Sequence, residues 1–149
     1  MENQALSLID RQLDRLTHYP EIADRLRDHR RETEQQIRRI DEQLSALGER
    51  PSALKDMAMS FIGNIAALGH VMAADEVLKN QFVNAAFENF EIASYRSLIA
   101  LAEAGGYETR LLEATLREEQ AMAAWVEESL PALTLKFVAL KATGRPASN

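Results

Sequence analysis

A chain of 149 residues, of which 46% are hydrophobic and 27% charged, is long enough to bury a core and is most economically a single domain. Its net charge of -6 argues against a nucleic-acid partner, because nucleic-acid phosphates require clustered Lys and Arg. Cysteine is absent, which excludes disulfides, thiolate metal sites and cysteine nucleophiles and fits a reducing compartment.

The start of the chain, MENQALSLIDRQLD, carries charges throughout and has no apolar core of a signal peptide. The most apolar long run covers residues 57–74 and includes Asn64 and His70. It falls short of the roughly 18 to 20 uninterrupted apolar residues that a membrane span needs. We therefore expect a cytoplasmic protein with no membrane partner.

Apolar residues at helical spacing predict a first helix over about residues 2–17. The motif HYPE breaks it, and Pro20 suits the first turn of a second helix that ends at Gly48. The outer face of the second helix is rich in Arg, Asp and Glu, which is typical of a solvated surface. A third helix is predicted over residues 53–73.

A long helix is predicted from about residue 76 to 104, and the pair Gly105-Gly106 ends it. A further helix covers roughly 108–130. Pro131 is expected to restart a short C-terminal helix in LTLKFVALKA. The predicted fold is therefore all-α: a four-helix bundle with a long, partly helical crossover and a short C-terminal helix.

We expect one domain over residues 1–142 and a flexible tail over 143–149. Large aromatic side chains are distributed around two of the predicted helices: Phe82, Phe87, Phe90 and Trp125. These helices have more apolar surface than one small bundle can bury. The sequence therefore predicts a homodimer.

Three carboxylates lie on stripes that should be apolar. In FENFEIASY, Glu91 falls in a narrow arc of aromatic and aliphatic residues, and Glu88 lies on its flank. Glu119 lies at the centre of the apolar stripe of the following helix. Its neighbour Glu118 points about 100° away, toward the rim. Burying unpaired carboxylates is expensive, so these positions require an explanation.

The first two helices add weaker candidates. Glu2 would extend the apolar stripe of the first helix, His29 and Gln36 edge the stripe of the second, and Glu32 lies further out. Several inward carboxylates become affordable when they share one or two cations. The Glu-x-x-His motif of bundles that bind two metal ions is missing, and His29, three residues before Glu32, forms only the reversed pair. A histidine at such an edge is more often a hydrogen-bonded core residue than a ligand.

The sequence contains four segments, ENQAL (2–6), HRRETEQQIRRID (29–41), ENFEIASYRSL (88–98) and LLEATLREEQ (111–120), that resemble signatures of the YciE/YciF-like ferritin-like family. They occur in the same order and at similar separations, with a one-residue gap in the first. Three positions depart from the family pattern: its His is Asn89 here, its Tyr is Phe90 and its Lys is Gln120.

The resemblance implies a ferritin-like bundle, commonly a dimer, linked to bacterial stress responses and without a settled catalytic activity. It also implies metal-site roles for the acids that match the family's inward carboxylates: Glu2, Glu32, Glu88, Glu91 and Glu119.

Two functions follow from these observations. In the first, these acids and His29 hold iron or manganese in a di-metal site, with Tyr95 nearby as a hydrogen-bond donor. In the second, the bundle is a non-catalytic structural or interaction protein that has lost the metal, and its acids pair with Arg25, Arg39 or water or are protonated. Whether the protein is an enzyme stays open. A hydrolase has no support, because Ser-His-Asp spacing, a nucleophile elbow and a phosphate loop are all absent from the sequence.

Overall fold

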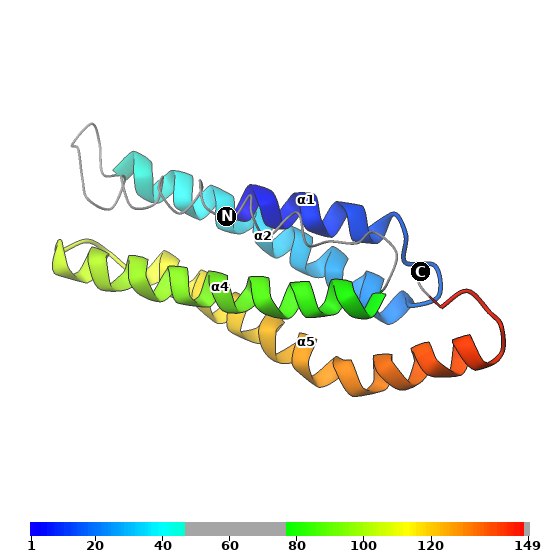
Figure 1. Cartoon of the computed structure of the whole chain (residues 1–149). Helices are drawn as coiled ribbons and strands as arrows, with labels where there is room; N and C mark the ends of the chain where they lie inside the picture. The colour runs from blue at the N-terminus through cyan, green and yellow to red at the C-terminus, as the bar shows by residue number, and fades with distance from the viewer. Residues whose placement is uncertain (47–76, 148–149) are drawn as a thin grey trace.

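A computed structural model describes residues 1–46 and 77–147 of the chain. The described part folds into the helices α1 (Glu2–Leu13), α2 (Pro20–Ala46), α4 (Val77–Ala104) and α5 (Arg110–Ala142). Figure 1 shows α1 antiparallel to α2 and α4 antiparallel to α5, and α2 also packs against α5. The predicted all-α bundle is confirmed. The helix predicted over 53–73, and with it the crossover, lies outside the described residues.

The first pair of helices departs from the prediction only at one end. α1 ends at Leu13 rather than near residue 17, because the chain turns early enough to bury Tyr19 completely. α2 begins at Pro20, and proline is tolerated there because the N–H of the first helical residue has no partner within the helix. The carbonyl of Tyr19 accepts hydrogen bonds from the N–H groups of Ile22 and Ala23 at 3.1 and 3.0 Å.

The α4–α5 turn follows the predicted glycine pair. Gly106 has a φ of 71°, the left-handed conformation that suits glycine best. The N–H of Tyr107 donates back to the carbonyl of Ala102 at 2.8 Å, and that of Gly106 donates to Glu103 at 3.0 Å. This pattern satisfies carbonyls that the end of a helix would otherwise leave free.

The predicted break at Pro131 is wrong, because residues 133–142 continue α5 and do not form a separate C-terminal helix. Proline removes one backbone hydrogen bond and bends a helix, but neighbouring contacts can hold the helix together. Here Leu133, the second residue after the proline, is 3% exposed and packs in a cluster with Tyr19 and Ile22. Figure 1 shows α5 changing direction between its orange and red parts.

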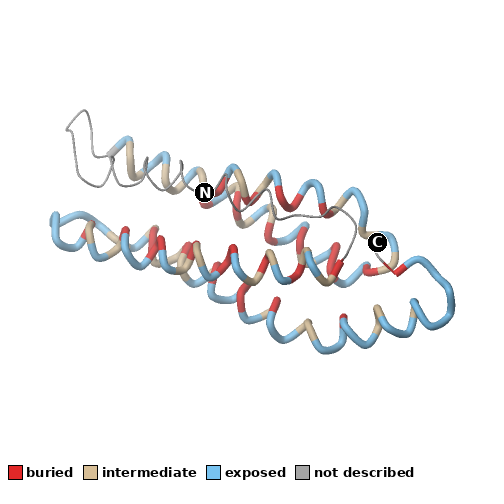
Figure 2. The backbone as a smooth tube through the Cα atoms, viewed as in Figure 1, coloured by how far each residue is buried: buried red, intermediate tan, exposed pale blue. Residues whose placement is uncertain are grey.

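The buried residues, red in Figure 2, lie mainly where the helices run alongside one another. Two apolar clusters form the core. The first gathers Met1, Leu8, Phe87, Tyr95, Leu98 and Leu112, among others, and the second Ile9, Tyr19, Leu26, Met122, Val126 and Leu133, among others. Several buried residues on the same faces are polar or charged, and these build the site described below.

The end of the described chain returns to the start of α2. The hydroxyl of Tyr19 donates to the carbonyl of Ala147 at 2.7 Å, and Ala147 is buried. Of the aromatic residues that favoured a dimer, Phe87 is buried, Phe90 and Trp125 are half-buried, and Phe82 is 56% exposed. Within residues 1–46 and 77–147, none of the helices combines the length and the apolar character needed to cross a membrane.

Candidate metal centre

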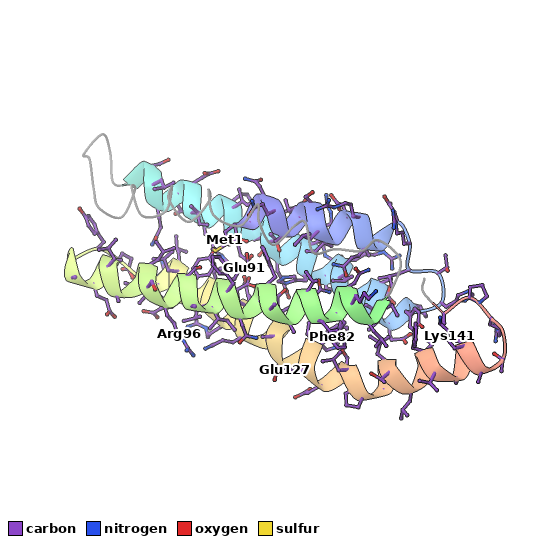
Figure 3. The ribbon with its side chains drawn as sticks, viewed as in Figure 1. Met1, Phe82, Glu91, Arg96, Glu127 and Lys141 are labelled. Atoms are coloured by element: carbon purple, nitrogen blue, oxygen red, sulfur yellow. The ribbon has the colours of Figure 1, made fainter. Side chains whose placement is uncertain are left out.

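Three helices bring one histidine and three carboxylates together. His29 from α2, Glu88 and Glu91 from α4, and Glu119 from α5 each offer a ligand atom, and these atoms all lie within 4.8 Å of one another. All four residues are buried. Glu88 and Glu91 share a face of α4 because they are three residues apart. Figure 3 shows Glu91 on the side of α4 that faces α1 and α2, near Met1, whereas Arg96 projects from the opposite side.

Several side-chain oxygen and nitrogen atoms of these four residues have no hydrogen-bond partner in the described part of the chain. The buried atoms without a partner are Nε2 of His29, Oε2 of Glu88, both oxygens of Glu91 and Oε2 of Glu119. Folded proteins rarely leave buried polar atoms unpaired, since each costs the desolvation that it does not recover. Protons, ordered water or a cation can stabilise such a group of carboxylates.

Burial and mutual repulsion keep protons on the carboxylates. Burial raises the pKa of Glu91, and the nearby charges of Glu2, Glu119 and Glu88 raise it further. The pKa of Glu119 is also raised by burial and by Glu88, while His29 opposes the shift. A cation in the group would reverse these directions, because it favours the ionised carboxylate.

Glu2 is buried beside the group, although the sequence places it at the end of a helix. The hydroxyl of Tyr95 donates to Oε1 of Glu2, and Oε2 of Glu2 has no partner among the described residues. Burial raises the pKa of Glu2 from 4.5 to about 7, and the hydrogen bond from Tyr95 opposes that rise. Glu2 shares electrostatic contacts with His29, Glu88 and Glu91, so it extends the same carboxylate group.

His29 lies between an outer and an inner carboxylate. Its Nδ1 is 3.0 Å from Oε2 of Glu32, and its Nε2 is 3.5 Å from Oε1 of Glu88 and 4.0 Å from Oε2 of Glu119. Burial alone would lower the pKa of this imidazole, but the surrounding carboxylates outweigh it and raise the pKa from 6.5 to about 10. Without a metal, a protonated His29 is therefore the internal counter-charge of the group.

Glu32 does not join the four inner residues. Its Oε2 accepts from Arg25 Nη1 at 3.1 Å as well as from the outer nitrogen of His29, and its side chain is 33% exposed. The hydrogen bond from His29 and the charge of Arg25 lower the pKa of Glu32. The structure thus places this sequence candidate on the far side of His29 from the inner carboxylates.

Sequence reasoning missed the role of Gln36. Its Nε2 donates to Oε1 of Glu119 and, at 3.2 Å, to Oε2 of Glu118. Glu118, which the sequence placed at the rim, is held by Arg39 through two hydrogen bonds of 2.6 and 2.8 Å. One signal was present in the sequence: Gln36 lies seven residues, or two turns, after His29 and so shares its face of α2.

A second polar layer, also missed from the sequence, shows how this fold satisfies structural polar groups. Gln12 and Asn84 exchange hydrogen bonds of 2.8 and 3.0 Å. Gln81 accepts from Asn84 at 3.3 Å and donates to Ser129 at 2.9 Å. These amides are paired, whereas the carboxylates of the inner group are not. The two layers therefore differ in whether their buried polar groups are satisfied by hydrogen bonds within the protein.

Comparisons with known proteins agree with the fold. A family model described as "Domain of unknown function (DUF892)" matches residues 1–139. Protein YciF of Escherichia coli (strain K12) is 36% identical over 122 residues, covering 73% of this chain and 69% of YciF. A solved structure from Xanthomonas campestris pv. campestris is similar with a TM-score of 0.76 and 30% identity, covering 95% of this chain and 89% of that one. YcfI of Rhodopseudomonas palustris, proposed as a structural protein, has a TM-score of 0.62 and 26% identity over 85% of this chain and 83% of its own.

Proposed function

The chain belongs to the YciF-like DUF892 family, and we propose that it binds iron or manganese in its buried carboxylate group. The observation that carries the proposal is the set of buried ligand atoms without partners: His29 Nε2, Glu88 Oε2, both oxygens of Glu91 and Glu119 Oε2. One ligand atom from each of these four residues lies within 4.8 Å of the others, which is close enough for one cation to contact all four residues.

The distribution of charge supports two ions in preference to one. The outer acids, Glu32 and Glu118, each have an arginine partner, Arg25 and Arg39. The four inner acids are Glu2, Glu88, Glu91 and Glu119, and in the described part of the chain the cations that act on them are His29 and, for Glu2, the N-terminal amino group. Two divalent ions carry four positive charges, which would balance four carboxylates and leave His29 neutral, the form in which imidazole binds metals.

The inner residues divide naturally between two ions. His29, Glu88, Glu91 and Glu119 would hold the first ion, because they form the convergent group. Glu2 would hold the second together with Glu91, both of whose oxygens are free to be shared. A set of carboxylates with one imidazole and no thiolate suits iron or manganese. When bound, such a pair of ions would supply redox chemistry toward oxygen or peroxide, and Tyr95 would donate its hydrogen bond to Glu2.

The second candidate function is a structural or interaction bundle without metal. The raised pKa values of Glu91 and Glu119 favour it, because protonated carboxyls need no cation. The imidazolium of His29 would then neutralise part of the remaining charge. This alternative satisfies the oxygens of Glu91 only through protons shared with neighbours such as Glu119, so we rank it second.

Glu119→Gln separates the two functions. If Glu119 holds metal, the change should remove bound metal and abolish stabilisation by added Mn²⁺ or Fe²⁺. For the wild type, that stabilisation should be about 3 kcal/mol, or roughly 5–10 °C in Tm, when the free ion is at a hundred times its Kd. If Glu119 is only a buried acid, the amide should be neutral or stabilising, because it avoids the cost of burying a charge.

The measurement is metal content per chain after purification without chelator, followed by thermal melts with and without added ion. Glu127→Gln is the control, since Glu127 is exposed on the same helix and should change neither quantity. A wild type that contains no metal, is not stabilised by either ion and melts below Glu119→Gln would end the metal proposal.

A further inference from the structure

α2 carries a polar stripe of five residues on one face. They follow one another at steps of four and three, the spacing that stacks side chains along a helix: Arg25, His29, Glu32, Gln36 and Arg39. Two of the five, His29 and Gln36, contact the inner carboxylates. Of the other three, Glu32 contacts His29 directly. Arg25 acts through Glu32, and Arg39 acts through Glu118 of α5.

The first arm of this arrangement runs from Arg25 through Glu32 to His29. Arg25 donates to the Glu32 oxygen that also faces Nδ1 of His29, at 3.1 and 3.0 Å. An imidazole whose Nδ1 donates to a carboxylate has its orientation and its tautomer fixed, so that Nε2 is left to bind. Nε2 of His29 is the buried nitrogen without a hydrogen-bond partner, and it faces the inner carboxylates.

The second arm runs from Arg39 through Glu118 and Gln36 to Glu119. Two parallel hydrogen bonds from Arg39 fix the plane of the Glu118 carboxylate, a geometry that arginine provides and lysine does not. Gln36 donates to Glu118 and to Oε1 of Glu119 with the same nitrogen. Because Oε1 of Glu119 is engaged, only its Oε2 remains available in the inner group.

We propose that the pairs Arg25–Glu32 and Arg39–Glu118 are positioning pairs that select which atoms of His29 and Glu119 face the metal. This inference rests on the proposed function, and it assigns Glu32 an orienting role instead of that of a ligand. The two arms would make His29 bind through Nε2 and Glu119 through one oxygen. Such partners typically change metal affinity by 10- to 100-fold.

The test measures the affinity of the metal-free full-length protein for Mn²⁺ by calorimetric titration in three matched variants. Glu32→Gln and Glu118→Gln remove the charge of each positioning pair. Glu34→Gln is the control, because Glu34 is also paired with an arginine of α2, Arg30 at 2.6 Å, and lies outside the inner group. The first two variants should bind 10- to 100-fold more weakly with an unchanged number of ions, and Glu34→Gln should bind like the wild type.

Two further readouts exclude a merely structural effect. The visible absorption spectrum of bound Co²⁺ reports coordination, and it should change shape in Glu32→Gln and Glu118→Gln but not in Glu34→Gln. Melts of the metal-free variants show whether each one folds. If either glutamine variant is unfolded, Arg39→Lys keeps the charge while removing the paired donors to Glu118, and Arg25→Met removes the single donor to Glu32. Both changes should weaken Mn²⁺ binding in the same direction.

The outcomes separate this inference from the function on which it rests. A wild type that binds no Mn²⁺ defeats the proposed function and the inference together. If Glu32→Gln and Glu118→Gln both bind Mn²⁺ as tightly as the wild type does, the inference is overturned and the proposed function stands. Loss of one whole ion in Glu32→Gln would show that Glu32 is itself a ligand, which also overturns the inference.

Discussion

Glu118 and Glu119 are adjacent in the sequence and have opposite environments. A step of about 100° around α5 gives Glu118 two hydrogen bonds from Arg39 and leaves Glu119 fully buried with one oxygen unpaired. The helical stripe alone predicted that Glu119 points inward. It could not predict the partners of Glu118, because Arg39 comes from a helix nearly eighty residues away in the chain.

At this scale the buried charges predict how stability depends on pH. The folded-state pKa values of Glu2 and His29 are raised, to about 7 and about 10, above their ordinary values of 4.5 and 6.5. The folded state therefore holds more protons than the unfolded state. The stability these groups contribute is complete below the ordinary pKa and is lost as pH rises through the folded pKa. Glu32, whose pKa is lowered, acts in the opposite direction and only in acid.

We expect the Tm of the metal-free protein to fall between roughly pH 5 and pH 9. The gain in Tm on adding Mn²⁺ should grow over the same range, because a metal binds only the deprotonated ligands. Calorimetric melts with chelator and with Mn²⁺ measure both trends. If the Tm of the metal-free protein instead rises steadily across this range, the raised pKa values of Glu2 and His29 are contradicted, independently of the result with Mn²⁺.

The residues of the candidate site were only partly predictable from the sequence. Glu88, Glu91 and Glu119 could be found because a carboxylate on an apolar stripe is a local anomaly. The roles of His29, Glu32 and Gln36 could not be assigned in the same way. His29 and Gln36 lie at the edge of the stripe of α2 and Glu32 lies further out, and their roles depend on which nitrogen or oxygen meets which partner.

At the scale of elements, the helices whose ends carry local signals were predicted well. Gly105-Gly106 ends α4 and Pro20 begins α2, because both signals act on the backbone within one turn. Pro131 was misread, because the outcome depends on distant contacts. Leu133 is buried against Tyr19 and Ile22 of another helix pair, and this packing holds α5 together past the proline.

Two leucines beyond the bend test whether the end of α5 is packed as the structure shows. Leu133 is 3% exposed and Leu135 is 72% exposed. Leu133→Ala should lower the free energy of unfolding by about 2–4 kcal/mol, because it leaves a cavity. Leu135→Ala should change it by less than about 0.5 kcal/mol. Urea denaturation measures both, and equal, small effects would mean that residues after Pro131 do not pack on the bundle.

At the scale of the whole molecule, exposed apolar side chains favour self-association. Phe82 of α4 and Leu135 and Val138 of α5 are each more than half exposed, and Phe82 projects from α4 on the side of Arg96, away from Met1 (Figure 3). Burying such residues against a second copy would remove them from water. The exposed positions were not predictable individually, because helical spacing does not show which part of a long helix lacks a neighbour.

We propose that the protein is a homodimer, and sedimentation velocity at micromolar concentration tests this. Replacing Phe82 and Val138 with serine should shift a dimer toward monomer while leaving the circular dichroism spectrum helical. Leu8→Ala is a useful contrast, because Leu8 is buried within one chain and its loss should lower stability without shifting the association. A monomeric wild type would rule out the dimer.

The division of the site between two helix pairs has a consequence for the order of folding. Within α1–α2 and within α4–α5 the contacts are local in sequence, so each pair can form rapidly. Docking the pairs brings together two parts of the chain that are far apart in the sequence, which costs chain entropy. Glu88, Glu91 and Glu119 all belong to the α4–α5 pair, whereas His29 belongs to α2, so these carboxylates meet their histidine counter-charge only at this docking step. Their repulsion therefore acts within the α4–α5 pair until docking, and a cation bound there would relieve that repulsion before His29 is in place.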